Sequence, residues 1–198
     1  MRVIFATKNP GKVKEIARIM ADFNIPVYTM TEAGFNPDID ESGTSFEENA
    51  LIKVRAIGAQ PDSIIMSDDS GISIDAMDGA PGIHSARYLG EDTPYDLKNN
   101  VILANLADVK GEARAAHYSC AVAILLPDGR EFVTLGEFHG RIAEEPKGTN
   151  GFGYDPIFYV PEYHMTAAEM APELKNSVSH RAKALTAAKE FLAKELTK

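Results

Sequence analysis

Two long apolar segments joined by a four-residue turn constrain the fold of this 198-residue chain most strongly. Residues 113–126 and 131–138 are typical of strands, and the intervening Pro127-Asp128-Gly129-Arg130 is typical of a hairpin turn. Earlier in the chain, residues 2–6 predict a short buried strand, and a helical periodicity follows from Lys12. Strand–helix alternation followed by a hairpin predicts an α/β (mixed α+β) fold with a mixed sheet, which we assign to a single domain over residues 1–198.

Three further helices are predicted from capping and periodicity. Ser45-Phe46-Glu47-Glu48 matches the capping-box pattern, so a helix is expected to begin there, with Asn49 and Lys53 sharing one of its faces. A second helix is expected over residues 94–106 and a third after Ser179. The core face of the first is expected to carry Phe46, Ala50, Val54 and Ile57, and that of the last Leu185, Ala188 and Leu192.

The loop after the first strand, Thr7-Lys8-Asn9-Pro10-Gly11-Lys12, has the features of an anion-binding site. It does not match the P-loop pattern, because Ala6 and Val13 occupy the positions of a required glycine and hydroxyl. A glycine nevertheless permits close backbone approach, a helix N-terminus presents free N–H groups, and two lysines add positive charge. The alternative interpretation of this hexapeptide alone is a lysine-bearing surface turn.

Asp68 and Asp69 follow the apolar run 64–66 and precede Ser70-Gly71, a pattern that predicts acids displayed where a strand ends. Adjacent carboxylates repel each other and are best tolerated around a hard cation such as Mg²⁺. Glu41 would complete an oxygen shell if the fold brings it to the pair. Because neighbouring side chains of a strand point to opposite faces, both aspartates can face one ion only if the strand has ended. The alternative is a solvated turn.

Two segments near the C-terminus combine aromatic and polar groups. Phe152-Gly153-Tyr154-Asp155 joins aromatic faces to a carboxylate acceptor, which suits stacking on a planar ring while its N–H edge is bound. Lys175 and Ser179-His180-Arg181 place hydrogen-bond donors near the start of the last helix. The alternatives are an aromatic loop anchor and ordinary helix capping. Lys53, usually a surface residue type, could reach a phosphate from its helix.

The composition excludes several classes. A net charge of -9 argues against a non-specific nucleic-acid binder, which usually has a basic excess. The single cysteine, Cys120, cannot form an intrachain disulfide, and its apolar run of seven residues is too short to span a bilayer. The N-terminal strand turns polar at Thr7, so it lacks the apolar region of a signal peptide. We therefore expect a cytoplasmic protein with no membrane or nucleic-acid partner.

Together these motifs resemble the inosine/xanthosine triphosphate pyrophosphatase family, and the match runs nearly from end to end in family order. The matching segments are residues 6–15, 44–50, 68–71, 79–83 with 85–88, 151–158 and 179–181. Ser67, Ile72 and His84 depart from the residues that are more common in the family. None of these departures removes a polar group that we assign to chemistry.

The resemblance implies a long central mixed sheet, two lobes flanking a nucleotide-binding cleft, and a homodimer. It also implies Mg²⁺-dependent hydrolysis of non-standard purine nucleoside triphosphates (ITP, dITP, XTP) to the monophosphate and pyrophosphate. Asp69 would be catalytic and, with Asp68 and Glu41, would bind the metal. The substrate-binding residues would be Thr7, Lys8, Asn9, Pro10, Gly11, Lys12, Lys53, Ser70, Phe152, Gly153, Tyr154, Asp155, Lys175, His180 and Arg181.

Two other functions fit parts of the sequence. A septum-inhibitor (Maf) type nucleotide pyrophosphatase is disfavoured by the Ser179-His180-Arg181 segment and the aromatic loop. A non-catalytic nucleotide sensor is disfavoured because a sensor gains little from the acids at positions 41, 68 and 69. Selectivity for ITP and XTP follows from their 6-oxo acceptor, since donors such as Lys175 would stay unpaired against the 6-amino group of adenine.

Overall fold

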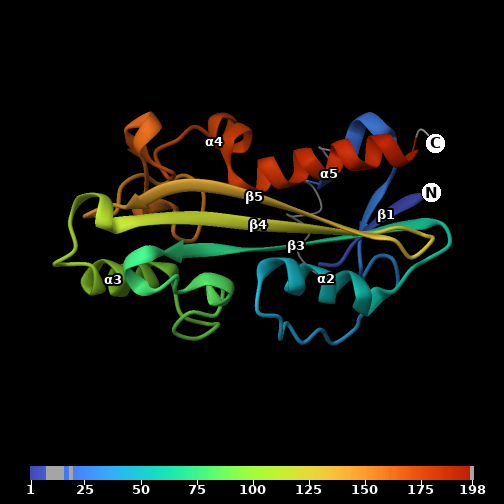
Figure 1. The fold of residues 1–198 in the computed structure, drawn as a ribbon, viewed down its shortest axis with the longest axis horizontal. Helices are drawn as coiled ribbons and strands as arrows, with labels where there is room; N and C mark the ends of the chain where they lie inside the picture. The colour runs from blue at the N-terminus through green and yellow to red at the C-terminus, as the bar shows by residue number, and fades with distance from the viewer. Residues whose placement is uncertain (8–15, 18–19, 197–198) are drawn as a thin grey trace. The chain divides into compact units, whose positions relative to one another are not determined.

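The computed structural model describes residues 1–7, 16–17 and 20–196. Its strands form one seven-stranded sheet in the order β2-β1-β3-β4-β5-β6-β7 (Figure 1). The chain divides into two compact units: unit 1 comprises residues 1–69, 120–136 and 183–198, and unit 2 comprises residues 70–119 and 137–182. β3 (Ser63–Ile74), β4 (Ala115–Leu125), β5 (Glu131–Ile142) and helix α5 (His180–Leu196) contribute residues to both.

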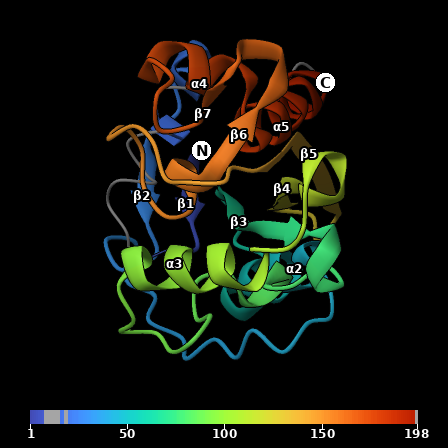
Figure 2. The same cartoon turned by 90° about the vertical axis from the view of Figure 1, so that its left-hand side faces the viewer.

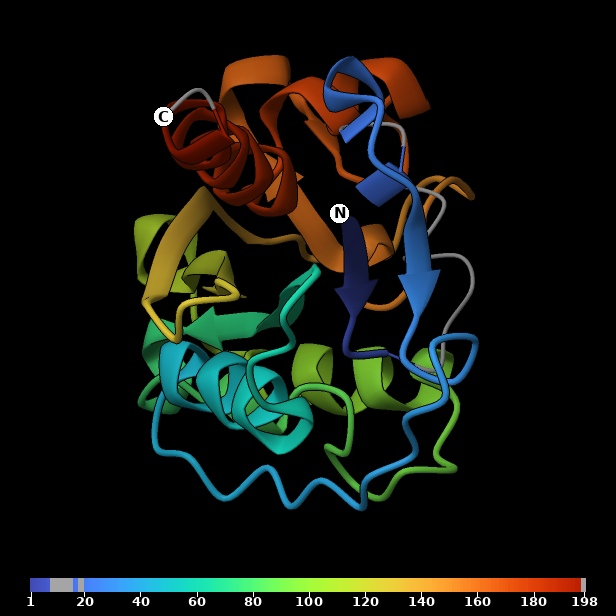
Figure 3. The same ribbon diagram turned by 90° about the vertical axis from the view of Figure 1, so that its right-hand side faces the viewer.

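In unit 1, alternation along the strands divides the core into two clusters. β1 (Arg2–Phe5) pairs in parallel with β2 (Val27–Thr29) and with β3. Val3 and Phe5 pack with the buried face of α5, whereas Ile4 packs with helix α2 (Phe46–Ile57). Figure 3 shows α5 and α2 on opposite sides of β1. Neighbouring strand residues therefore face different helices, and this parity decides where the side chains of β3 point.

Helix α2 begins as the capping pattern predicts. Ser45 is its N-cap, and the Ser45 Oγ accepts the Glu48 N–H at 3.1 Å. The Glu48 carboxylate reaches one residue further back than in a standard capping box and accepts from the backbone N–H of Thr44 at 2.6 Å. The predicted core face is confirmed, since Ala50, Val54 and Ile57 are buried and Phe46 packs against them.

In unit 2, an antiparallel extension of the sheet packs around a second core. β6 (Phe158–Val160) pairs antiparallel with β5 and with β7 (Met165–Thr166). Helices α3 (Tyr95–Asn105) and α4 (Pro172–Val178) lie on either side of β6 in Figure 2. The predicted helix over 94–106 is confirmed within one residue at each end.

Short 3-10 helices occur at Met20–Phe23, Asp75–Met77, Gly82–His84, Gly111–Arg114, Asp155–Ile157 and Pro161–Tyr163.

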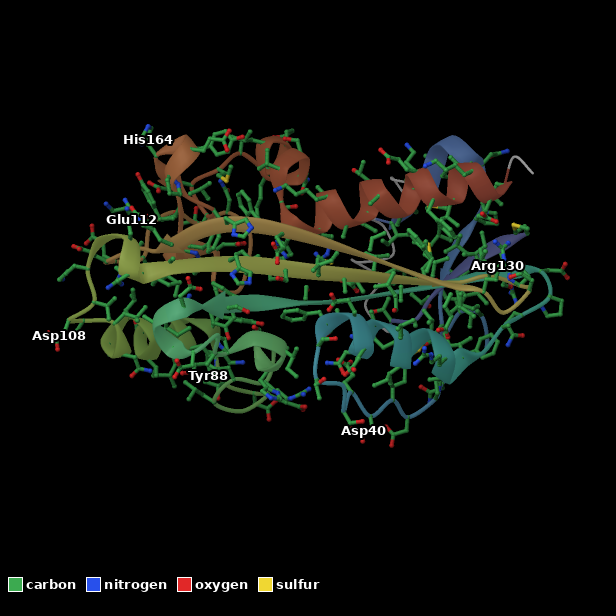
Figure 4. The ribbon with its side chains drawn as sticks, viewed as in Figure 1. Asp40, Tyr88, Asp108, Glu112, Arg130 and His164 are labelled. Carbon is green, nitrogen blue, oxygen red and sulfur yellow. The ribbon has the colours of Figure 1, made fainter. Side chains whose placement is uncertain are left out.

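The hairpin prediction is also confirmed, with a longer second strand than expected. Arg130 in the β4–β5 turn (labelled in Figure 4) donates to Asp128 at 2.7 Å and to Glu195 of α5 at 2.8 Å. Residues Leu185, Ala188 and Leu192 of α5 are buried, as predicted, and Cys120 is buried as well. The predicted mixed α/β fold is therefore the observed one. No helix within the described part of the chain has the length and apolar character needed to cross a membrane.

One predicted boundary is wrong. The strand that carries the two aspartates does not end at Ser70-Gly71, because β3 continues to Ile74. Ile72 and Ile74 are fully buried in the core of unit 2, and the backbone N–H of Ile72 donates to the Ser85 hydroxyl at 2.9 Å. Aspartate, serine and glycine are typical turn residues, but burial of the apolar residues beyond them holds the strand extended.

Candidate active site

Unit 1 contains a cluster of acids around one lysine. Lys53 extends from α2, and its Nζ lies 2.9 Å from Asp69 Oδ1 on β3 and 3.1 Å from Glu41 Oε2. The same Nζ donates to the backbone carbonyl of Asp68 at 3.0 Å. Glu41 belongs to the loop before α2, in which Figure 4 labels the preceding residue, Asp40. We call Glu41, Lys53 and Asp69 the acid–lysine cluster.

Burial makes the charges of this cluster interact strongly. The side chains of Lys53 and Asp69 are 10% and 12% exposed, so little water separates them. Burial raises the pKa of Asp69, the Lys53 ammonium opposes this change, and the nearby Glu41 carboxylate adds to it. Burial also lowers the pKa of Lys53, but attraction to Asp69 and Glu41 outweighs that loss, so its net shift is upward. Lys53 therefore stays charged, and Asp69 holds a proton more readily than an exposed aspartate.

The two adjacent aspartates point to different faces of β3. Ser67 donates its hydroxyl to the Ala50 carbonyl of α2 at 2.6 Å, and Asp69 contacts Lys53 of the same helix. Met66 packs in the cluster that contains α5, so Asp68 follows the parity of Met66 and faces away from α2. Asp68 is buried, with an exposed fraction of 4%. Because the strand continues, Asp68 and Asp69 do not converge as the sequence analysis expected.

The expected shell of three carboxylates stays a prediction, and the continuing strand does not bring Asp68 to Glu41 and Asp69. Within residues 1–7, 16–17 and 20–196, no three His, Cys, Asp or Glu side chains come together as a group that could hold a metal. Glu41 and Asp69 remain as a pair on the α2 side of β3. Two carboxylates suit Mg²⁺, which commonly takes one or two protein carboxylates and fills its other positions with water and substrate phosphates. The donor set fits this ion.

Unit 2 contains a second pairing of an aspartate with a lysine. Asp155 Oδ2 accepts the Phe152 N–H at 2.8 Å and also the Lys175 ammonium, and Oδ1 accepts the Tyr118 hydroxyl at 3.3 Å. The Asp155 side chain is only 3% exposed. We call Tyr118, Phe152, Asp155 and Lys175 the aromatic-loop cluster. Both oxygens of Asp155 are engaged, so this carboxylate fixes the shape of the loop 151–155.

Gly151 and Phe152 show how the loop uses that shape. Gly151 has a φ of +75°, and a Cβ at this position would lie 2.1 Å from Asp155 Oδ2, so the loop needs a glycine there. Phe152 is 67% exposed, and Lys175 Nζ lies 5.4 Å from the centre of its ring. An exposed aromatic face beside a fixed ammonium provides a surface on which a planar ring can stack.

His180 and Arg181 lie at the start of α5, where the sequence predicts a cap. The Ser179 Oγ accepts the Ala182 N–H at 3.3 Å, which confirms the cap. The His180 ring stacks on Tyr118, with ring centres 4.8 Å apart and planes inclined by 11°. Burial and the neighbouring Asp155 raise the pKa of Tyr118, so its hydroxyl stays protonated and donates to that carboxylate. His180, Lys175 and the loop are thus tied together through Tyr118 and Asp155.

Several residues that hold the loop 151–155 in place were not predicted from the sequence. The Asn99 amide of α3 donates to the Gly153 carbonyl at 3.1 Å, and the Tyr154 hydroxyl donates to the Ser85 carbonyl at 2.7 Å. Tyr95 meets Tyr154 edge to face at 5.3 Å. The only signal in the sequence was a buried-type position in the predicted helix 94–106 occupied by asparagine. Tyr118 carried no signal, because it lies inside an apolar strand.

The predicted triphosphate-binding loop after β1 is described only at its first residue. Lys8, Asn9, Pro10, Gly11 and Lys12 lie outside the described residues, so their assignment stays a prediction. Thr7 is described, and its N–H donates to the Phe5 carbonyl at 2.7 Å. Ser70 is half-buried within β3, next to Asp69.

Unit 2 also has a groove of about 740 Å³ that contains none of the predicted site residues. Glu112 and His164, labelled in Figure 4, mark its neighbourhood. Arg114 donates to four backbone carbonyls, and Arg141 pairs with Glu112 at 3.1 Å. Lys147 pairs with Glu145 at 3.1 Å. Because these cations are engaged by the protein itself, we assign the groove no ligand.

A mixed sheet, an acid–lysine cluster in unit 1 and an aromatic-loop cluster in unit 2 define an α/β protein with two preformed polar clusters. The chain belongs to the Ham1 family, whose profile matches residues 3–191. A protein of Bacillus licheniformis named dITP/XTP pyrophosphatase is 46% identical over 185 residues, covering 92% of this chain and 93% of that protein. A protein of Listeria monocytogenes with the same name is 42% identical over 197 residues, covering 100% and 97%.

Solved structures agree with this assignment. The structure of a HAM1 protein from Coxiella burnetii superposes with a TM-score of 0.90 at 37% identity, covering 98% of this chain and 99% of the other. The Ham1 protein of Staphylococcus aureus gives the same TM-score at 36% identity, covering 98% and 100%. The observed fold is therefore that of the family along nearly the whole chain.

Proposed function

We propose that this chain is a dITP/XTP pyrophosphatase, which hydrolyses ITP, dITP and XTP to the monophosphate and pyrophosphate. Membership of the Ham1 family and the names of its relatives support the reaction class. The observation that carries the proposal is the acid–lysine cluster, in which Lys53 holds one oxygen of a buried Asp69 beside Glu41. The protein would thereby cleanse the nucleotide pool.

Asp69 is the proposed catalytic base. Its raised pKa makes it a stronger base than an exposed aspartate, and such a base can take the proton of an attacking water. Lys53 binds Oδ1, which fixes the carboxylate and leaves Oδ2 as the atom for proton transfer. As the water attacks, the bond between the α and β phosphates breaks and pyrophosphate leaves.

Glu41 and Asp69 would hold Mg²⁺. When bound, the ion supplies the charge neutralisation that phosphoryl chemistry requires. Asp68 is also a metal ligand in the prediction from the sequence. Because Asp68 faces the other side of β3, we now propose that it acts on the cluster through its charge, which helps to raise the pKa of Lys53. Thr7 and the segment 8–12 are proposed to bind the triphosphate, with Lys53 assisting.

The aromatic-loop cluster is the proposed base-binding part. Phe152 would stack on the purine ring, and Lys175, His180 and Arg181 would donate to its oxo groups, with Ser70, Gly153 and Tyr154 contacting the nucleotide. Asp155 would serve mainly by holding the loop, because its oxygens already accept three donors. A purine with a 6-amino group would offer no acceptor to Lys175, His180 and Arg181. Each buried hydrogen bond lost in this way would cost about 1–3 kcal/mol.

Pyrophosphate release from ITP, XTP, dGTP, dATP and dTTP, with and without Mg²⁺, tests the proposal. We expect metal-dependent release mainly from ITP and XTP. Release mainly from pyrimidine nucleotides would instead favour the Maf-type reaction. Tight binding of ITP without release would favour a sensor. A homodimer and a cytoplasmic location are further proposals that light scattering and fractionation would test.

A further inference from the structure

Asn49 lies four residues before Lys53 on the same face of α2, and its side chain is fully buried, with an exposed fraction of 0%. Its Oδ1 accepts the backbone N–H of Gly43 at 2.9 Å. Within the side-chain amide of Asn49, only the oxygen can accept a hydrogen bond from an N–H group. The bond to Gly43 therefore fixes the orientation of the amide. The Nδ2 group must then point away from Gly43.

The Gly43 bond belongs to a close contact between the Glu41 loop and α2. A Cβ on Gly43 would lie 2.7 Å from Asn49 Oδ1 and 2.8 Å from Glu48 Cβ, so the loop backbone rests directly on the helix. The neighbouring Thr44 donates its N–H and its hydroxyl to Glu48 at 2.6 and 2.8 Å. Glu41 is only two residues before Gly43, so this contact sets where the Glu41 carboxylate can reach.

Two complementary buried atoms in the same cluster lack a partner within the described residues: the donor Asn49 Nδ2 and the acceptor Asp69 Oδ2. A buried polar atom left unpaired is costly, and the pair could satisfy each other. Asn49 is close enough to Asp69 that its amide lowers the pKa of that carboxyl, against the larger effect of burial. Lys53 already takes the other oxygen, Oδ1.

We propose that Asn49 is a positioning residue that joins the two carboxylates of the acid–lysine cluster. Its oxygen holds the Glu41 loop through Gly43, and its N–H group donates to Asp69 Oδ2 in the working enzyme. With Oδ1 held by Lys53 and one side of Oδ2 held by Asn49, the carboxylate cannot rotate, and one lone pair stays directed at the water. This inference rests on the proposed role of Asp69 as the base.

Asn49→Asp tests the two hydrogen bonds of the amide separately, because it keeps an acceptor for Gly43 and removes the donor to Asp69. Asn49→Ala removes both. We expect kcat for ITP to fall by about 10²-fold in each variant, with KM changed by less than about threefold, the pattern of a lost transition-state interaction. Asn49→Asp keeps the anchor for Gly43 and lacks the donor to Asp69, so a wild-type kcat in this variant would overturn the proposal.

Binding of Mn²⁺, followed by electron paramagnetic resonance without substrate, gives a readout that does not depend on turnover. We expect Asn49→Ala to weaken Mn²⁺ binding by about tenfold, equivalent to 1.4 kcal/mol. Asn99→Ala is the matched control, since Asn99 is also a buried helical asparagine, 4% exposed, but lies in unit 2. It should lower the melting temperature comparably and leave Mn²⁺ binding unchanged. Equal loss of Mn²⁺ binding in both variants would contradict the proposal.

Failure of the two proposals can be told apart. If the wild-type protein releases no pyrophosphate from ITP, the proposed function fails. If the wild type is active and Asn49→Asp equals it in kcat, only the role of Asn49 fails. If Asn49→Asp does not fold, Gly43→Ala is the second variant: it displaces the loop from Asn49 Oδ1 and should lower kcat and Mn²⁺ binding together. Wild-type behaviour of Gly43→Ala would overturn the proposed coupling.

Discussion

Both units pair a largely buried aspartate with a helical lysine, and the two pairs are built differently. In unit 1, Lys53 serves Asp69 and Glu41, so one cation faces two carboxylates. In unit 2, Asp155 is the one carboxylate among the described residues that pairs with Lys175. Both oxygens of Asp155 are bonded, whereas Asp69 Oδ2 has no partner among the described residues.

We propose that this difference separates a catalytic cluster in unit 1 from a base-binding cluster in unit 2. An excess of negative charge and an unused buried oxygen leave the acid–lysine cluster incomplete, so it can accept a cation and a proton. The aromatic-loop cluster is electrically balanced and complete, so it gains nothing from a metal and instead presents a rigid aromatic face. If this contrast is correct, similar substitutions in the two units must alter different kinetic constants.

Lys53→Met should have the larger effect of the two lysine substitutions. It removes the cation that holds Asp69 and limits the rise in the pKa of that carboxyl. We therefore expect kcat for ITP to fall by about 10²-fold, as when a preorganised charge is removed from a reaction site. The ratio of kcat/KM for ITP to that for ATP should stay near its wild-type value. Steady-state pyrophosphate release measures both, and a changed ratio with an unchanged kcat would reverse the roles of the units.

Lys175→Met should act on selectivity. It removes a donor that we assign to the purine and frees the loop from Asp155, so the ITP-to-ATP ratio of kcat/KM should fall by about tenfold, the value of one buried hydrogen bond. Lys175→Arg, which keeps the charge, is the matched control and should retain part of the ratio. An undiminished ratio in Lys175→Met would remove this lysine from base recognition.

Glu41→Gln should lower the pKa of Asp69 in the metal-free protein. Burial raises that pKa and the Glu41 charge adds to the rise, so removing this charge removes one of its causes. Bound Mg²⁺ would favour the charged carboxylate, so the comparison is made without the metal. Titration of the Asp69 carboxyl carbon by NMR in wild type and variant would check the direction, and a higher pKa in the variant would be inconsistent with it.

Tyr118→Phe should have the smallest effect. It removes the hydroxyl that donates to Asp155 but keeps the ring that stacks on His180, so we expect a loss of about 1 kcal/mol in the free energy of unfolding. Tyr154→Phe, which removes the donor to Ser85, is the comparison. Thermal unfolding measures both, and full wild-type stability in Tyr118→Phe would indicate that Lys175 and Phe152 suffice to hold Asp155.

The sequence predicted the elements well where local signals agree with burial. The Ser45 cap, the α2 core face and the β4–β5 turn are local patterns, and the structure confirms them. It failed at Ser70-Gly71, where turn-type residues continue a strand because Ile72 and Ile74 are buried beyond them. Alternation of those isoleucines was the available signal.

The candidate site could be predicted only in part. Resemblance identified Glu41, Lys53 and Asp69, and their contacts agree with a shared role. It could not show that Asp68 faces away from them, because that follows from the unexpected length of β3. Tyr118 gave no signal, Asn99 gave only its place in a predicted helix, and Asn49 gave only the helix face that it shares with Lys53. The partners of all three are distant in sequence or are backbone groups. Such contacts depend on the folded chain.

Asp69→Asn tests the central claim most directly. Pyrophosphate release from ITP and ATP should be measured for this variant and the wild type in one assay, with thermal unfolding as a check on the fold. We predict a fall in kcat for ITP of about 10³-fold, the size expected for loss of a general base, with the ITP-to-ATP ratio preserved. A folded Asp69→Asn protein with near-normal turnover of ITP would contradict the account.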